Sequence, residues 1–256
     1  MGLRDLFELG GKVALVTGGS RGLGLQIAKG LGEMGAKIAI SARKAGELEE
    51  AKAELEKLGI DAFAVTNDLS KQGEIPSLVE AVVKHYGAIN ILVNNAGATW
   101  GAKAEEHPIE AWNKVMTLNA GSVFALSQAV ANRCFIPQRA GNIIVVASTA
   151  ALRAGLQMKA AAYYSSKAAA LHLTRALAVE WGKYHIRVNA ICPGFFPSKM
   201  ANSLIATILP EVIAHTPLGR IGGDTDLQGA AVYLASDASR FVTGQYIAVD
   251  GGASSA

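Results

Sequence analysis

Short apolar runs alternate with helix-like segments along the whole 256-residue chain, and this alternation limits the possible folds more than any other feature. The runs are rich in Val and Ile and are mostly continuous, as is typical of strands covered on both faces. The predicted strands are 12–17, 37–42, 61–66, 90–94, 142–148, 186–192 and 245–249. The predicted helices are 22–34, 45–58, 71–86, 108–135, 160–181 and 224–235. Repeated strand–helix units predict right-handed crossovers and a doubly wound parallel sheet of the α/β class.

Composition narrows the class of protein further. Half of the residues are apolar and 18% are charged, which excludes an intrinsically disordered chain. The net charge is +3 and the basic residues are scattered, so we expect no nucleic-acid partner. The chain shows no signal peptide and no apolar run long enough to span a bilayer, so we expect a cytoplasmic protein without a membrane partner. No linker is visible. We therefore expect one domain over residues 1–256, with a substrate lid at about 193–218.

The first predicted strand runs into a glycine-rich turn just before the first predicted helix. Without side chains, the glycines let backbone N–H groups approach an anion, and the helix N-terminus adds positive potential. This arrangement predicts a phosphate cradle and hence a nucleotide ligand. The spacing Gly18-x-x-x-Gly22-x-Gly24 differs from the common dinucleotide fingerprint, and a tight turn with no ligand is the alternative.

The end of the second predicted strand carries no carboxylate, although NAD-binding chains usually have one there for the ribose. Arg43 stands at this place instead, and Arg21 lies inside the glycine-rich turn. A guanidinium can donate two hydrogen bonds to a 2′-phosphate, so the sequence predicts NADP(H) as the cofactor. Ordinary solvated charges are the alternative for Arg43 and Lys44. After the third strand, Asp68 is expected to bind the adenine amino group, with a helix N-cap formed by Asp68 or Ser70 as the alternative.

Tyr163 and Lys167 are four residues apart in a predicted helix and therefore share a face. They follow a strand that ends at Ser148, at the sheet edge where ligands bind in such folds. Reducing a ketone with hydride requires a proton for the developing alkoxide. A phenol has a pKa of about 10, and we expect the Lys167 ammonium to lower it. Ser148 is expected to donate a hydrogen bond to the substrate oxygen. Tyr164 and Thr149 are the alternatives to Tyr163 and Ser148.

These motifs together resemble those of the short-chain dehydrogenase/reductase family. They follow the order of the family and span about residues 11–252. The matching elements are Thr17-Gly18-x-x-x-Gly22-x-Gly24, Asn94-Asn95-Ala96-Gly97, Asn119, Ser148, Tyr163-x-x-x-Lys167, Pro193-Gly194 and Val249-Asp250-Gly251-Gly252. The resemblance implies a Rossmann-type fold, NADP(H) as cofactor and a homotetramer. The separation between Ser148 and Tyr163 is longer than usual, which keeps Thr149 open as the alternative to Ser148.

The resemblance also implies a role for each residue of the site. Tyr163 is the general acid/base, and Lys167 lowers its pKa and binds the nicotinamide ribose. Ser148 positions the carbonyl, Asn119 holds a proton-relaying water, and Ser198 contacts the carboxamide. No metal is implied. The implied cofactor-binding residues are Gly18, Ser20, Arg21, Gly22, Leu23, Gly24, Arg43, Asp68, Leu69, Asn95, Ala96, Gly97, Tyr163, Lys167, Pro193, Gly194, Phe196 and Ser198.

The residues expected around the substrate are mainly apolar. They are Ala98, Thr99, Trp100, Leu156, Met158, Phe195, Phe196, Met200, Leu204 and Ile205, with Arg153, Lys159 and Lys199 near the edge. We therefore expect an oxidoreductase that interconverts a largely apolar ketone, such as a 3-oxoacyl thioester, and its secondary alcohol. Segments 6–12 and 216–220 are similar to those of gluconate 5-dehydrogenases, so a sugar-acid substrate is the alternative. A more distant alternative is an inactive NADP-binding sensor or scaffold.

Overall fold

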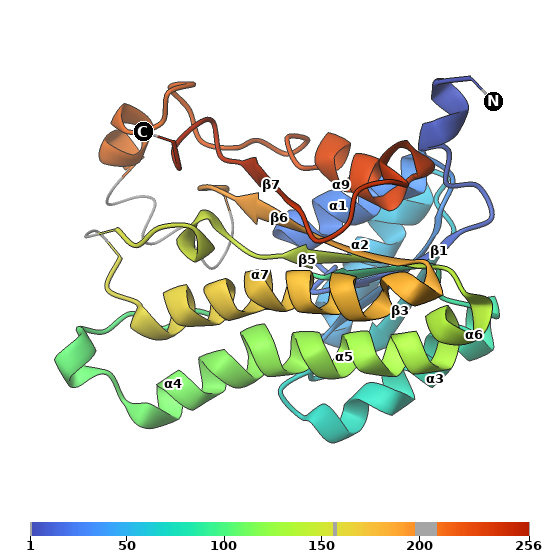
Figure 1. Cartoon of the computed structure of the whole chain (residues 1–256), viewed down its shortest axis with the longest axis horizontal. Coiled ribbons are helices and arrows are strands. Elements are labelled where there is room, and N and C mark those ends of the chain that lie inside the picture. Colours follow the sequence, from blue (N-terminus) through green and yellow to red (C-terminus); the bar gives the residue numbers. More distant parts are fainter. Residues whose placement is uncertain (1, 156–157, 198–208, 256) are drawn as a thin grey trace.

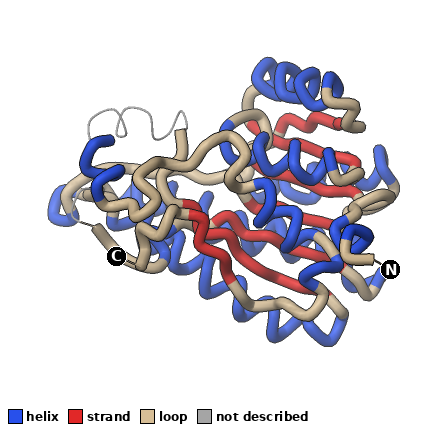
Figure 2. Tube along the Cα trace, turned by 90° about the horizontal axis from the view of Figure 1, so that it is seen from above, coloured by secondary structure: helices blue, strands red, loops and turns tan. Residues whose placement is uncertain are grey.

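A parallel sheet forms the centre of the molecule in the computed structural model, which describes residues 2–155, 158–197 and 209–255. Its seven strands lie in the order β3-β2-β1-β4-β5-β6-β7, and every neighbouring pair is parallel. They form a twisted row when seen from above (Figure 2). The strands are β1 (Val13–Thr17), β2 (Lys37–Ala42), β3 (Ala62–Thr66), β4 (Ile91–Asn94), β5 (Gly141–Val146), β6 (Ile186–Pro193) and β7 (Tyr246–Val249). The strand order reverses between β1 and β4, so the predicted doubly wound sheet of the α/β class is confirmed.

Helices cover both faces of this sheet (Figure 1). On one face, in the lower half of Figure 1, lie α3 (Ile75–Tyr86), α4 (Ile109–Met116), α5 (Ser122–Val130) and α7 (Ala161–Trp181). On the other lie α1 (Gly22–Glu33), α2 (Ala45–Lys57) and α9 (Gln228–Ala235). In β1, Val13 and Leu15 pack into one buried cluster, whereas Ala14 and Val16 pack into the other. Successive side chains point to opposite faces, which explains why the strand is apolar throughout.

The predicted helix over 108–135 is a series of helical segments in the structure. A π-helical turn, Thr117–Gly121, follows α4, and a second one, Ala131–Phe135, follows α5. A short α6 (Ile136–Gln138) ends the series. A π turn inserts an extra residue into the helical register and so changes the direction in which later side chains point. The first π turn carries Asn119, whose side chain is buried.

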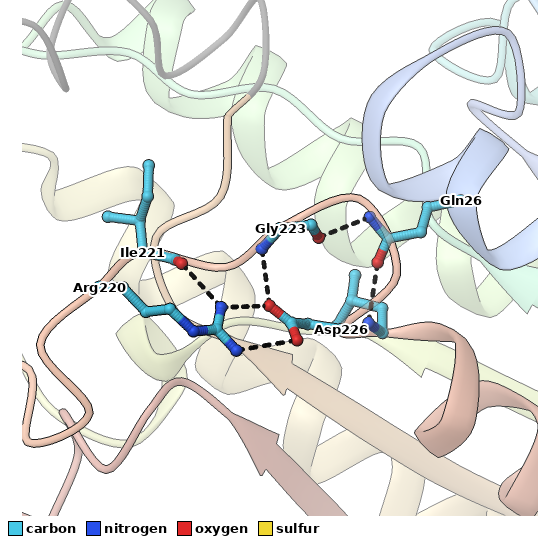
Figure 3. A network of polar contacts seen from close by, with 6 residues as sticks. Gln26, Arg220, Ile221, Gly223 and Asp226 are labelled. Atoms are coloured by element: carbon cyan, nitrogen blue, oxygen red, sulfur yellow. Dashed lines mark hydrogen bonds and ion pairs between the residues drawn. The ribbon is translucent and has the colours of Figure 1, made fainter.

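A polar network fixes the segment before α9 against α1 (Figure 3). Asp226 accepts hydrogen bonds from both terminal nitrogens of Arg220, at 2.5 and 3.0 Å, and from Gly223 N–H at 2.7 Å. Gln26 of α1 donates to Gly223 O at 3.0 Å and accepts from Leu227 N–H at 2.8 Å. The Arg220 hydrogen bond and the Gly223 N–H lower the pKa of Asp226 to about 2. Because this network occupies the preceding turns, α9 begins later than the sequence predicts.

Asn142 attaches α9 to the sheet, and its substitution should destabilise the fold. Its buried amide nitrogen donates to Leu234 O at 2.7 Å and to Ala235 O at 2.9 Å, at a helix end that lacks its own donors. Replacement by Leu removes both donors, so we expect Asn142→Leu to lower the free energy of unfolding by about 1–3 kcal/mol in urea denaturation. The exposed Asn113→Leu is the control, with an expected change within about 0.5 kcal/mol. Equal stability of the two variants would contradict this role.

Candidate active site

A cavity of about 430 Å³ runs along the carboxyl ends of the strands, where ligands bind in doubly wound sheets. Most of the predicted site residues line it. They are Gly18, Ser20, Arg21, Gly22, Leu23, Arg43, Asp68, Leu69, Asn95, Ala96, Gly97, Ser148, Tyr163, Lys167, Gly194 and Phe196. Gly24, Asn119 and Pro193 are not among the lining residues. Ser198 lies outside the described residues.

Two glycines of the glycine-rich turn, Gly18 and Gly24, are packed too closely for a side chain to replace their hydrogen atoms. Gly18 has a φ of +63°, in the left-handed region that favours glycine. A Cβ on Gly18 would lie 2.8 Å from Asn95 Nδ2, and one on Gly24 would lie 2.5 Å from the same atom. Arg21, the N-cap of α1, makes no side-chain capping hydrogen bond, so the first N–H groups of this helix remain available to an anion. The turn therefore fits the phosphates of a nucleotide.

Three cations and two carboxylates gather where β2 and β3 end. They are Arg21, Arg43, Lys44, Glu47 and Asp68, and all of them line the cavity. Arg21 Nη1 donates to both oxygens of Glu47, at 2.9 Å each, and Lys44 Nζ lies 3.2 Å from Glu47 Oε1. The excess of positive charge fits the extra phosphate of a 2′-phosphorylated dinucleotide. Sequence reasoning missed Glu47, for which the only local signal is its place three residues after Lys44.

Asp68 forms a tight turn with Ser70, but neither residue is a helix N-cap, because Lys71 precedes the 3-10 helix Gln72–Glu74. Its Oδ1 accepts from Ser70 N–H at 3.0 Å and from Ser70 Oγ at 2.7 Å. Burial acts to raise the pKa of Asp68, but the Ser70 hydrogen bonds, with the charges of Arg43 and Lys71, bring it below its ordinary value. Asp68 is therefore a carboxylate at neutral pH and still lines the cavity.

Ser148, Tyr163 and Lys167 come together at another part of the cavity. The Ser148 side chain lies beside the Tyr163 phenol and acts to lower its pKa, and Ser148 Oγ accepts from Ala150 N–H at 3.1 Å. Lys167 Nζ lies 5.8 Å from the centre of the Tyr163 ring and donates to Val146 O at 2.8 Å. The last residue of β5, Val146, thus supplies the hydrogen-bond acceptor of the lysine, and the serine follows two residues later. The first turns of α7 supply the tyrosine and the lysine.

The alternative residues have different contacts. The Tyr164 hydroxyl donates to Gly155 O at 3.2 Å and accepts from Gly155 N–H at 3.0 Å. Thr149 lines the cavity, but Ser148 is the hydroxyl residue that acts on the pKa of Tyr163. The geometry therefore favours Ser148 and Tyr163 over their neighbours.

Asn119 supports the site from the first π turn. Its Oδ1 accepts from Ala98 N–H at 2.8 Å, and its Nδ2 donates to Ala98 O at 2.8 Å and to Ser166 Oγ at 2.9 Å. A Cβ on Gly97 would lie 3.2 Å from Asn119 Oδ1 and 3.6 Å from Lys167 Nζ, so these three groups adjoin one another. Both amide hydrogens of Asn119 are used within the protein. The expected water would therefore meet its backbone carbonyl or the second lone pair of Oδ1.

Known proteins match this chain over nearly its whole length. A family model described as enoyl-(acyl carrier protein) reductase matches residues 18–254. A gluconate 5-dehydrogenase of Gluconobacter oxydans is 39% identical, over 97% of this chain and 96% of the relative. The rhamnolipids biosynthesis 3-oxoacyl-(acyl-carrier-protein) reductase of Pseudomonas aeruginosa is also 39% identical, over 98% and 99%. A crystal structure of a gluconate 5-dehydrogenase from Burkholderia cenocepacia, in complex with NADP and tartrate, has a TM-score of 0.94 at 35% identity and 100% coverage of both chains.

The chain belongs to the short-chain dehydrogenase/reductase family. The fold that the family implies is the fold observed.

Burial controls the protonation of the two titratable residues in this family site. Desolvation raises the pKa of the Tyr163 phenol, and the Ser148 hydroxyl offsets only part of that rise. Desolvation lowers the pKa of the Lys167 ammonium to about 8. The expectation that Lys167 depresses the Tyr163 pKa is therefore not met in this structure. Desolvation is the largest influence on the Tyr163 pKa, and the Lys167 ammonium lies 5.8 Å from the centre of the ring.

The expected substrate lining is partly present. Thr99, Met158, Phe195 and Phe196 line the cavity, whereas Ala98 and Trp100 do not, and Trp100 is exposed. Arg153, expected at the edge, also lines it. Lys159, also expected at the edge, does not line it. The remaining expected residues, Leu156, Lys199, Met200, Leu204 and Ile205, lie outside the described residues. The described lining combines apolar side chains with one cation.

Neither a metal-binding cluster nor a membrane-spanning helix is found among the residues that the structure describes. Among residues 2–155, 158–197 and 209–255, no three His, Cys, Asp or Glu side chains are grouped as metal ligands would be. Within the same ranges, no helix combines the length and the apolar character needed to cross a membrane.

The buried Lys167 should give the protein a distinctive pH dependence of stability. Its folded pKa of about 8 lies below the ordinary value of 10.5, so between these values the unfolded chain binds more protons. Stability from this group therefore rises with pH over that interval. We expect the wild type to gain up to about 3 kcal/mol relative to Lys167→Met, measured by urea denaturation across the interval. The exposed Lys84→Met should show no such change relative to wild type. A flat or falling difference for Lys167→Met would contradict the low pKa.

Proposed function

We propose that this protein is an NADP(H)-dependent oxidoreductase that interconverts a ketone and its secondary alcohol. One observation carries the proposal: a single cavity joins a phosphate cradle and its cations to the side chains of Ser148, Tyr163 and Lys167. The gluconate 5-dehydrogenase of known structure, which contains NADP, supports the same cofactor. When bound, NADPH supplies a hydride to the carbonyl carbon.

The side chains of the protein provide the proton and stabilise charge. Tyr163 is the proton donor, and its raised pKa keeps the phenol protonated at neutral pH. Ser148 donates a hydrogen bond to the substrate oxygen, on which negative charge develops. With its pKa of about 8, Lys167 is mainly protonated at pH 7 and stabilises the phenolate that remains after proton transfer. In alcohol oxidation the same phenolate takes the proton back.

The proposed cofactor site uses both backbone and side chains. The turn at Gly18, Ser20, Gly22 and Leu23 holds the diphosphate, while Arg21 and Arg43 bind the 2′-phosphate. Asp68 and Leu69 contact the adenine, and Lys167 binds the nicotinamide ribose. The residues proposed to line the nicotinamide half are Asn95, Ala96, Gly97, Tyr163, Gly194, Phe196 and Ser198. Gly24 and Pro193 act through packing of the backbone.

A largely apolar ketone such as a 3-oxoacyl thioester is the proposed substrate class, supported by the apolar lining at Met158, Phe195 and Phe196. A sugar acid is the second candidate, since Arg153 adds a cation to this lining and a gluconate 5-dehydrogenase with a similar fold contains tartrate. Comparing kcat/KM for a 3-oxoacyl thioester and for 5-ketogluconate, through NADPH absorbance, separates the two classes. Binding of NADPH without turnover of any ketone would instead support the sensor or scaffold alternative.

We also propose a cytoplasmic homotetramer in which each chain is one domain and segment 193–218 covers the substrate. The exposed apolar side chains Phe124 on α5 and Val179 on α7 support assembly through the helical face. Exposed Tyr246, at the start of the edge strand β7, and exposed Phe241, five residues earlier in the chain, support a second contact. Light scattering on the purified protein measures the mass, and a monomer would contradict the assembly.

Tyr163→Phe should abolish most of the activity while leaving cofactor binding intact. The variant loses the proton donor but keeps the ring, so we expect kcat to fall by about a hundredfold or more. The NADPH dissociation constant, measured by fluorescence titration, should remain near the wild-type value. Tyr164→Phe, its neighbour on α7, is the control and should retain kcat within a few-fold. A wild-type kcat in Tyr163→Phe would contradict the assigned role.

Arg43→Asp should shift the cofactor preference toward NAD(H). The new carboxylate repels a 2′-phosphate and can accept a hydrogen bond from a ribose hydroxyl, so the ratio of kcat/KM for NADPH to that for NADH should fall by about tenfold or more. Arg4→Asp, at the exposed N-terminal 3-10 helix, makes the same charge change away from the cavity and should leave the ratio unchanged. An unaltered ratio in Arg43→Asp would mean that Arg43 does not contact the phosphate.

A further inference from the structure

Glu47 places a carboxylate among the cations that are proposed to bind the 2′-phosphate. It lies in the first turn of α2 and lines the cavity together with Arg21, Arg43 and Lys44. Both of its oxygens accept from Arg21 Nη1 at 2.9 Å, and Oε1 also accepts from Lys44 Nζ at 3.2 Å. One carboxylate therefore engages two of the three cations of this cluster.

The third cation, Arg43, has different neighbours from Arg21 and Lys44. No hydrogen bond or ion pair joins Arg43 to a carboxylate in the described part of the chain. Arg43 acts on Asp68 only through its charge, which helps to lower the Asp68 pKa against the effect of burial. The Oδ1 of Asp68 is itself occupied by Ser70. Arg43 is thus the cation most available to a phosphate, whereas Arg21 and Lys44 share Glu47.

The geometry at Arg21 determines how a phosphate would meet this carboxylate. Glu47 uses Nη1, while Nη2 and Nε make no hydrogen bond to any described residue. A phosphate would therefore bind Arg21 on the Nη2 and Nε side, with Glu47 beside the same guanidinium, or else draw Arg21 away from Glu47. The first arrangement brings two anions close together, and the second breaks an ion pair. A dinucleotide without the 2′-phosphate meets neither cost.

We propose that Glu47 is a specificity-determining residue that weakens binding of 2′-phosphorylated dinucleotides and so narrows the preference for NADP(H) over NAD(H). This inference rests on the proposed NADP(H) function. The physical basis is repulsion between the Glu47 carboxylate and the 2′-phosphate, within a cluster whose cations attract that phosphate. The repulsion acts against NADP(H) and not against NAD(H), so it changes the difference between their affinities. The effect is modest because these side chains are only partly buried: Arg21 is 49% exposed and Glu47 24%.

The test compares two variants that each remove one negative charge from α2. Glu47→Gln removes the carboxylate beside Arg21, and Glu50→Gln removes an exposed carboxylate of the same helix. The probes are adenosine 2′,5′-bisphosphate and adenosine 5′-monophosphate, which differ only in the 2′-phosphate, titrated by calorimetry. We expect Glu47→Gln to bind the bisphosphate about twofold to fivefold more tightly and the monophosphate unchanged. Glu50→Gln should change neither dissociation constant.

Glu47→Ala is a second variant and should act in the same direction, since it also removes the carboxylate. The ratio of kcat/KM for NADPH to that for NADH should rise by the same factor in both Glu47 variants. Unchanged or weaker bisphosphate binding in both would overturn the inference and indicate that Glu47 orients Arg21 for the phosphate. Equal tightening in Glu50→Gln would also overturn it, because the effect would then follow net charge alone. A wild type that binds both probes equally would instead contradict the NADP(H) function itself.

Discussion

The hydrogen bonds between the ends of β1 and β4 hold the sheet together at the point where its strand order reverses. Thr17 Oγ1 donates to Val93 O at 3.2 Å and accepts from the N–H groups of Asn95 and Ala96 at 3.0 and 3.1 Å. The Asn95 amide donates to Thr17 O at 2.8 Å and to Gly18 O at 3.2 Å. These bonds fix the glycine-rich turn against the neighbouring strand. The cavity, and with it every proposed contact to the cofactor, depends on that attachment.

At the catalytic end of the cavity, loss of contact with water shifts the pKa values of Tyr163 and Lys167. Lys167 is 6% exposed, and its ammonium has a backbone carbonyl, Val146 O, rather than a carboxylate as its partner. A buried ammonium without a counter-charge has a lowered pKa, and a buried phenol has a raised one. The same loss of water thus keeps Tyr163 able to donate a proton while it weakens the charge of Lys167. A bound substrate oxygen that becomes negative would change this balance, since it supplies the missing counter-charge.

Much of this arrangement could be predicted from the sequence, because strands covered on both faces must be apolar and the turn between β1 and α1 needs glycine. The four-residue spacing of Tyr163 and Lys167 also places them on one helix face. The π turn at Asn119 could not be predicted, since inserting one residue into the helical register leaves the apolar pattern almost unchanged. The raised pKa of Tyr163 depends on tertiary burial, which no local pattern encodes. Glu47 meets Arg21 only because the start of α1 and the first turn of α2 adjoin in space.

The charged side chains at the two ends of the cavity differ in their exposure to solvent, and so in how strongly solvent screens their interactions. At the catalytic end, Lys167 is buried with a backbone carbonyl as its partner, so desolvation shifts its pKa strongly. At the phosphate end, the charged side chains remain partly exposed, and solvent and salt screen their interactions. Substitutions among exposed charges therefore change affinity by small steps, whereas substitutions among the buried groups change the reaction itself. Under the proposed assignments, the cofactor preference can therefore change through Arg21, Arg43, Lys44 and Glu47 without disturbing proton transfer at Tyr163.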